Sequence, residues 1–103
     1  VDGHTLTAWI DIAATPDEVI EPFQTWQPPF TGLPTQPEKT ILYLPEENRP
    51  QPRLDRNRGN GMTVSVGRVR DGIRFVAMGH NTIRGAAGAS VLNAELLHTK
   101  KYF

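Results

Sequence analysis

The stretch IRFVAMGHNTIRGAAGASVLNAELL, residues 73–97, predicts a strand, a turn and a helix around which the rest of the fold is arranged. Its first six residues alternate between two faces, a pattern that predicts a strand over residues 73–78. Gly79 and Asn81 tolerate a left-handed backbone, so residues 79–82 are expected to turn. A helix then begins among the small residues 85–90 and continues through the more apolar residues 91–97.

A helix that starts with almost no side chains has two interpretations. Its free N–H groups and its dipole favour a partly negative or polar partner, which small residues would let approach closely. Alternatively, glycine and alanine let the helix pack tightly against a strand. Composition alone favours this second interpretation.

Just before that stretch, residues 62–70 alternate as a second strand, and Asp71-Gly72 predicts a hairpin turn between the two strands. Gly67 inside this strand indicates a bulge or a close backbone approach. Residues 40–44 are β-branched and aromatic, which predicts a further short strand.

Near the start of the sequence, residues 3–12 alternate as a half-buried strand, and His4 lies at its rim. An isolated histidine at a strand end is more often exposed or hydrogen-bonded than catalytic. Thr15, Pro16 and Glu18 predict a helix start with a capping box. Pro22 is expected to kink this helix or to end it early.

Two loops are predicted, over residues 27–38 and 45–61. The second holds four arginines, at positions 49, 53, 56 and 58. They could clamp a phosphate or carboxylate, but three acidic residues offset much of their charge. A solvated surface loop is the favoured interpretation.

The element order β–α–β–β–β–α predicts an α+β domain with an antiparallel or mixed sheet and its helices packed on one face. At 103 residues the chain suffices for one small domain, and its net charge of zero favours neither nucleic acid nor an anionic membrane as partner. There is no apolar run of about 18 residues, as a transmembrane helix needs. The absence of cysteine excludes a disulfide or a thiol nucleophile within these residues, and no metal site is predicted.

Three blocks carry a family resemblance: VDGHT at residues 1–5, NRPQPRLDRNRGNGMTVSVGRVR at 48–70 and GHNTIRGAAGASVLNAELL at 79–97. In this order and spacing they resemble the C-terminal end of aspartate-β-semialdehyde dehydrogenases, specifically their fungal branch. The resemblance implies that residues 1–103 are the C-terminal part of a catalytic and dimerisation domain. The N-terminal nucleotide-binding domain would be absent, and the abrupt start without methionine also suggests a fragment.

The resemblance implies a cytoplasmic enzyme that reduces β-aspartyl phosphate to aspartate-β-semialdehyde with NADPH, in lysine, methionine and threonine biosynthesis. In that family a cysteine thiolate attacks the acyl centre and a histidine acts as acid and base. His4 matches this catalytic histidine. Asn81, followed by Gly85 and Ala86, matches the contact with the nicotinamide end of NADP.

The cysteine is missing, and the family's carboxylate-binding arginine would precede Val1, so this portion alone is expected to be inactive. Self-association is also expected, because the strand 73–78 is apolar on both faces. Two alternatives without catalysis remain: an oligomerisation piece or a stand-alone binding module.

Overall fold

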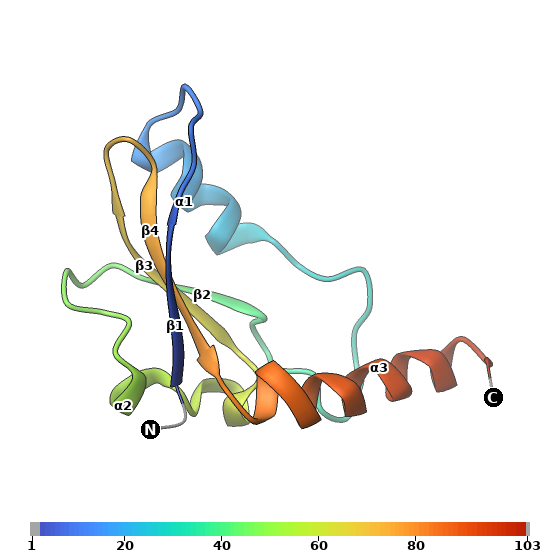
Figure 1. The fold of residues 1–103 in the computed structure, drawn as a ribbon. Helices are drawn as coiled ribbons and strands as arrows, with labels where there is room; N and C mark the ends of the chain where they lie inside the picture. Colours follow the sequence, from blue (N-terminus) through green and yellow to red (C-terminus); the bar gives the residue numbers. More distant parts are fainter. Residues whose placement is uncertain (1–2, 103) are drawn as a thin grey trace.

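The computed structural model describes residues 3–102 of the chain (Figure 1). The elements, in chain order, are β1 (Gly3–Trp9), α1 (Pro16–Thr25), β2 (Ile41–Leu44), α2 (Pro52–Asp55), the 3₁₀ turn η1 (Arg58–Gly61), β3 (Val64–Arg70), β4 (Arg74–His80), the π-helical turn η2 (Ile83–Ala87) and α3 (Gly88–Thr99).

The strands form one mixed sheet in the order β1-β4-β3-β2. β4 lies antiparallel to both β1 and β3, whereas β2 and β3 are parallel. Two parallel strands need a long crossover, and residues 45–63 supply it. The expected α+β class with a mixed sheet is therefore confirmed, as is the hairpin between β3 and β4.

The limits of β4 differ from the prediction of residues 73–78. Ile73 is fully buried inside the hairpin turn with φ at 51°, so it cannot begin the strand. At the other end β4 continues through Gly79 and His80, because these two residues pair with His4 and Gly3 of β1. The turn predicted at residues 79–82 shrinks to two residues for the same reason.

Gly67 is confirmed as both a bulge and a close approach. The register of the β3–β4 pair shifts after Gly67. A side-chain carbon placed there would collide with the carbonyl oxygen of Arg49 in the crossover. A glycine at this position therefore lets the crossover lie directly against β3.

Helix α1 begins with the predicted capping box. The Thr15 hydroxyl accepts from the Glu18 amide, and the Glu18 carboxylate accepts from the Thr15 amide. Pro22 does not end the helix early, since α1 continues to Thr25. The price of an interior proline is a lost hydrogen bond to residue i−4, and here that residue is exposed Glu18, whose carbonyl water can reach.

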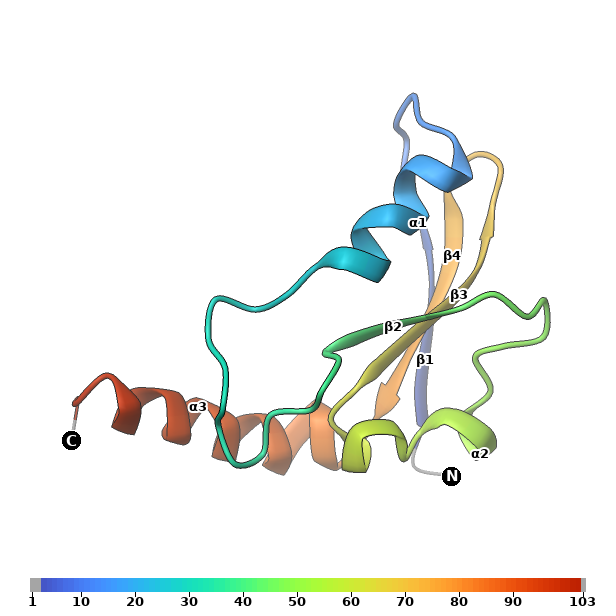
Figure 2. The ribbon, with the colours of Figure 1, turned by 180° about the vertical axis from the view of Figure 1, so that it is seen from behind.

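The helices lie on different faces of the sheet, rather than on one. Phe23 of α1 packs edge-to-face on Phe75 of β4, with ring centroids 5.2 Å apart. Figure 2 shows α1 in front of the sheet. On the opposite face, a side chain at Gly3 would collide with Pro52, which places α2 against the ends of β1 and β4.

Helix α3 extends away from the end of the sheet (Figure 1). A small core of Leu33, Met62 and Leu92 joins it to the loop 27–38 and to the crossover. The Glu95 carboxylate also accepts from the amide and hydroxyl of Thr35, at 3.0 and 2.7 Å. The loop 27–38 thus has a structural role in holding α3.

The interpretation of residues 45–61 as a solvated surface loop is wrong, because part of this crossover is buried. Asp55 is completely buried, and its carboxylate accepts from Arg49, from Arg58 and from the Gln51 amide. The Arg49 guanidinium uses both Nε and Nη2. Sequence charge balance could not reveal this, because it counts acidic residues without showing which one the arginines surround.

Strand β1 is more exposed than the predicted half-buried strand. It is an edge strand, and Leu6 and Trp9 are 50% and 73% exposed. Beyond the strand, Ile10 and Ile12 remain 40% and 51% exposed. An uncovered apolar edge of this kind is unusual on a monomeric surface.

Candidate functional site

The pairing of β1 with β4 builds the site at one end of the sheet. His4 lies directly opposite Gly79. Opposed side chains in an antiparallel pair share a face and normally touch. Gly79 has none, and an added side-chain carbon there would have only the Val64 Cγ2, at 3.8 Å, within contact distance. The His4 imidazole therefore faces open space across the strand pair.

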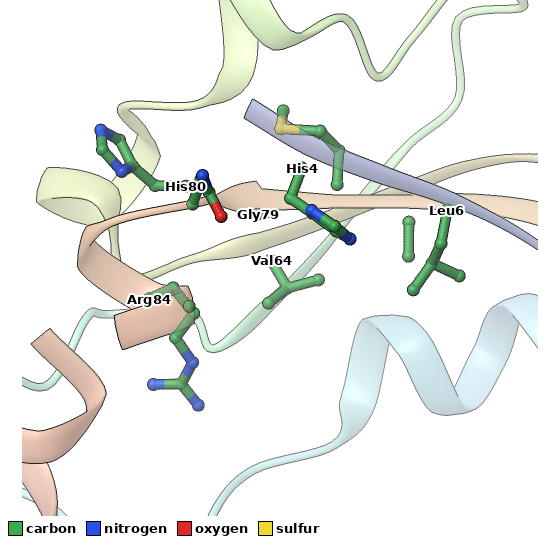
Figure 3. A pocket seen from close by; sticks show the side chains of 10 residues that line it. His4, Leu6, Val64, Gly79, His80 and Arg84 are labelled. Atoms are coloured by element: carbon green, nitrogen blue, oxygen red, sulfur yellow. The ribbon is translucent and has the colours of Figure 1, made fainter. Parts of the chain in front are cut away.

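That space is a pocket of about 340 Å³ (Figure 3). Its lining residues come from β1, β3, β4 and the turn that follows β4: His4, Leu6, Val64, Ala77, Met78, Gly79, His80, Asn81, Arg84 and Gly85. Leu6, Val64 and Ala77 make one wall apolar. His4, Asn81 and Arg84 supply polar groups, so the pocket has the mixed lining of a small-molecule site.

Three of the four predicted site residues meet in this pocket. His4 comes from β1, whereas Asn81 and Gly85 come from the segment after β4. Ala86 is exposed and does not line the pocket. The catalytic role predicted for His4 and the cofactor contacts predicted for the other three stay predictions.

Arg84 is a lining residue that the sequence reasoning missed. Its guanidinium lies below Gly79 and Val64 in Figure 3. Nη1 of Arg84 is buried, with no hydrogen-bond partner among the described residues. A buried guanidinium nitrogen without an acceptor is suited to a phosphate or carboxylate. The sequence did hold a clue to this residue, because Arg84 is the charged residue that directly precedes the small residues 85–90.

The arginine-rich crossover does not contribute to this pocket. Arg49 and Arg58 are both paired with Asp55, and neither lines the cavity. The hydrogen bond from Arg49, followed by those from the Gln51 amide and Arg58, holds the pKa of Asp55 far below its usual value against the opposing effect of burial. The same pair raises the pKa of Arg49. The cluster therefore stabilises the crossover.

The pocket offers one group suited to proton transfer. The His4 side chain is exposed at the rim, within reach of a ligand in the cavity. An imidazole can take a proton from one reacting group and return it to another at neutral pH. The chain has no cysteine, so any thiol that His4 serves must come from outside these 103 residues.

Among the described residues, no helix is long and apolar enough to cross a membrane.

Comparisons with known proteins agree on one family. The model of the semialdehyde dehydrogenase dimerisation domain matches residues 1–84. A protein named aspartate-semialdehyde dehydrogenase, from Archaeoglobus fulgidus, is 48% identical over 107 residues, which cover 98% of this chain and 31% of that protein. A malonyl CoA reductase (NADP) from Metallosphaera sedula is 42% identical over 112 residues, covering 99% of this chain and 31% of that protein.

A solved fungal structure has the same fold. It is the aspartate semialdehyde dehydrogenase with NADP from Candida albicans, with a TM-score of 0.83 and 37% sequence identity. The match covers 100% of this chain and 32% of that one. The chain thus spans about a third of the length of the proteins that it matches.

Proposed function

This chain belongs to the semialdehyde dehydrogenase family, whose dimerisation domain it matches, and on that premise we propose that it is part of an NADP-dependent aspartate-semialdehyde dehydrogenase. The reaction is the reduction of β-aspartyl phosphate by NADPH to aspartate-β-semialdehyde, with release of phosphate. It serves the biosynthesis of lysine, methionine and threonine. Residues 1–103 would be the C-terminal part of the catalytic and dimerisation domain, in a cytoplasmic enzyme.

The observation that carries this proposal is the single pocket that unites His4 with Asn81 and Gly85. His4 lies far from Asn81 and Gly85 in the sequence, yet the resemblance assigns all three to one active site. His4 would accept the proton of the attacking thiol and later return it to a leaving or reacting oxygen.

The pocket also fits a nicotinamide cofactor, which supplies the hydride when bound. Asn81 and Gly85 would hold its nicotinamide end, with Ala86 next to them in the chain. Nη1 of Arg84, which has no hydrogen-bond partner in the part of the chain that the structure describes, is an additional donor that an anionic group on the substrate or cofactor would satisfy. An open, partly apolar wall beside these donors gives a planar ring a place to lie.

The test is the reverse reaction of the intact protein. Aspartate-β-semialdehyde, phosphate and NADP⁺ should together yield NADPH, and omitting phosphate should abolish the signal. Residues 1–103 alone should give none, because they contain no thiol. Turnover by this cysteine-free chain would contradict the mechanism, and failure of the intact protein would contradict the function.

A second substrate follows from the malonyl CoA reductase among the relatives. If this chain had that second function, the substrate beside His4 would be a malonyl thioester rather than an acyl phosphate. Both are activated acyl groups that a thiol can attack, so the same pocket could serve either. Malonyl-CoA given with NADPH decides between them: oxidation of NADPH with this substrate, and none with β-aspartyl phosphate, would favour the second function.

We also propose that the protein self-associates, as expected for a dimerisation domain. The exposed apolar edge of β1 supports this. The alternative, a non-catalytic oligomerisation or binding module, predicts self-association without any turnover by the intact protein.

A further inference from the structure

The segment that follows β4, made of a two-residue turn and η2, carries three of the residues that line the pocket: Asn81 in the turn, and Arg84 and Gly85 in η2. The first N–H groups of a helix have no acceptor within the helix, so something else must satisfy them. Usually the side chain of the N-cap residue does so. Here the N-cap is Thr82, and its side chain makes no such bond.

The imidazole of His80 supplies the acceptor that the Thr82 side chain does not. Its Nδ1 accepts from the amide of Thr82 at 3.2 Å and from the amide of Ile83 at 3.2 Å. His80 is only 6% exposed, so water cannot easily replace it. Because Nδ1 accepts, it carries no proton, and the ring proton lies on Nε2.

His80 does not reach a ligand in the pocket with this ring. Successive side chains of a strand point to opposite faces, and His80 follows Gly79, which lies opposite His4. Figure 3 shows the His80 ring directed away from His4 and from Arg84. Its effect on the site must therefore pass through the turn.

We propose that His80 is a positioning residue, whose imidazole caps the turn after β4 and so fixes Asn81, Arg84 and Gly85 beside His4. The functional consequence rests on the proposed dehydrogenase activity. Without the cap, the amides of Thr82 and Ile83 lose their acceptor, and the turn rearranges so that water can satisfy them. The groups proposed to hold the cofactor then lose their placement, while His4 on β1 keeps its own.

The experiment compares two replacements of His80 in the intact enzyme. His80→Leu removes the acceptor, whereas His80→Asn keeps an oxygen acceptor on a residue that caps helices well. His80→Leu should raise the KM for NADP⁺ about tenfold, as expected when a buried donor loses its partner. It should lower kcat by less than about threefold, and His80→Asn should bring KM back to within about threefold of the wild type.

Thr15→Ala is the matched control. It also removes a helix cap and should lower stability by about 1 kcal/mol, but α1 does not line the pocket. Its KM should stay unchanged. A His80→Leu enzyme with the KM of Thr15→Ala would overturn the proposal, and so would a His80→Asn enzyme as impaired as His80→Leu.

A spectroscopic measurement keeps the proposal separate from the assigned activity. In the wild-type protein, ¹⁵N shifts of the His80 ring should show a bare Nδ1 and a protonated Nε2. The amide protons of Thr82 and Ile83 should exchange with solvent more slowly than in His80→Leu. Fast exchange in both proteins, or a protonated Nδ1, would refute the cap even if the enzyme reaction is another one.

Discussion

At the scale of single residues, the pocket depends on one side chain that is present and one that is missing. His4 supplies the imidazole, and Gly79 across the strand pair leaves it room. Glycine usually weakens a strand, so its position opposite the proposed catalytic group indicates a role in the shape of the pocket.

We expect His4→Ala to lower kcat of the intact enzyme by about two to four orders of magnitude, the usual scale for lost acid–base catalysis. KM should change little, because the other polar groups of the pocket remain. Steady-state kinetics of the reverse reaction measure both constants. His98→Ala, on α3 away from the pocket, is the control. A normal kcat in His4→Ala would leave His4 as an ordinary strand-end histidine.

Gly79→Val should separate activity from stability. The open space opposite His4 accepts a side chain, and valine suits a strand, so the free energy of unfolding should change by less than about 1 kcal/mol. The same side chain fills the pocket, and kcat/KM should fall at least about tenfold. Denaturant unfolding tests the expected small change in the free energy of unfolding, and steady-state kinetics test the expected fall in kcat/KM. Thr5→Val, the next residue after His4 and therefore on the opposite face of β1, should leave kcat/KM unchanged.

Asp55→Asn should lower the free energy of unfolding by about 3 kcal/mol, because it leaves two arginines without their buried partner. The pKa of Asp55 is depressed in the folded protein, chiefly by Arg49. Its stabilisation is therefore complete above the unfolded pKa of about 4 and is lost as the pH falls below that value. Unfolding curves from neutral to acidic pH should show a smaller acid loss in the variant. Glu47→Gln, on the exposed part of the crossover, should keep the wild-type profile.

At the scale of elements, the sequence predicted those features that depend only on residues close together in the chain. The capping box at Thr15, the bulge at Gly67 and the β3–β4 hairpin are all confirmed. The prediction of β4 failed at both ends, because Ile73 is drawn into the hairpin turn and His80 is extended by its partner Gly3 in β1. A single stretch of sequence cannot show pairing with a distant strand.

The candidate site likewise contains residues that the sequence predicted and residues that only the folded structure reveals. The family resemblance predicted His4, Asn81, Gly85 and Ala86 as site residues, and the first three of them line one pocket in the structure. It did not identify Arg84, since burial of one nitrogen atom depends on how η2 packs. The buried Asp55 was missed because its partners come from both sides of α2.

Two glycines near the start of α3 should respond differently to alanine. At Gly88, an added side-chain carbon would lie 2.6 Å from the sulfur of Met62 and 2.8 Å from the carbonyl oxygen of Ile83. Gly88→Ala should therefore destabilise by about 1–3 kcal/mol despite the better helix propensity of alanine. At Gly85 the nearest atom is the His80 carbonyl oxygen, at 3.3 Å. In thermal unfolding, the melting temperature of Gly85→Ala should lie well above that of Gly88→Ala. Equal melting temperatures would contradict the packing argument.

At the scale of the whole molecule, the sheet has an uncovered apolar border. β1 is one of the two edge strands, and its backbone groups on the outer side have no strand to pair with in the described part of the chain. Leu6 and Trp9 add exposed apolar area to that edge. Proteins normally cover such an edge, most economically with a second copy around a two-fold axis.

Sedimentation of the protein over a range of concentrations should therefore show a dimer or a larger species. Trp9→Lys places a charge on the β1 border and should shift the equilibrium toward the monomer. Tyr102→Lys is the matched control, because Tyr102 is also 73% exposed but lies beyond the end of α3. A monomer at every concentration would exclude self-association, and equal effects of the two substitutions would exclude the β1 border.

The strand order also has a consequence for how the protein folds. Among the described strands β1 comes first in the sequence and its partner β4 comes last, whereas β3 and β4 are joined by a tight turn. Local contacts form quickly and distant ones slowly, so the β3–β4 hairpin should nucleate the sheet and β1 should join late. During synthesis His4 leaves the ribosome before Gly79, with which it pairs in the folded sheet. The pocket is thus among the last features to be completed, and a folding intermediate with a finished hairpin but no β1 would lack the pocket.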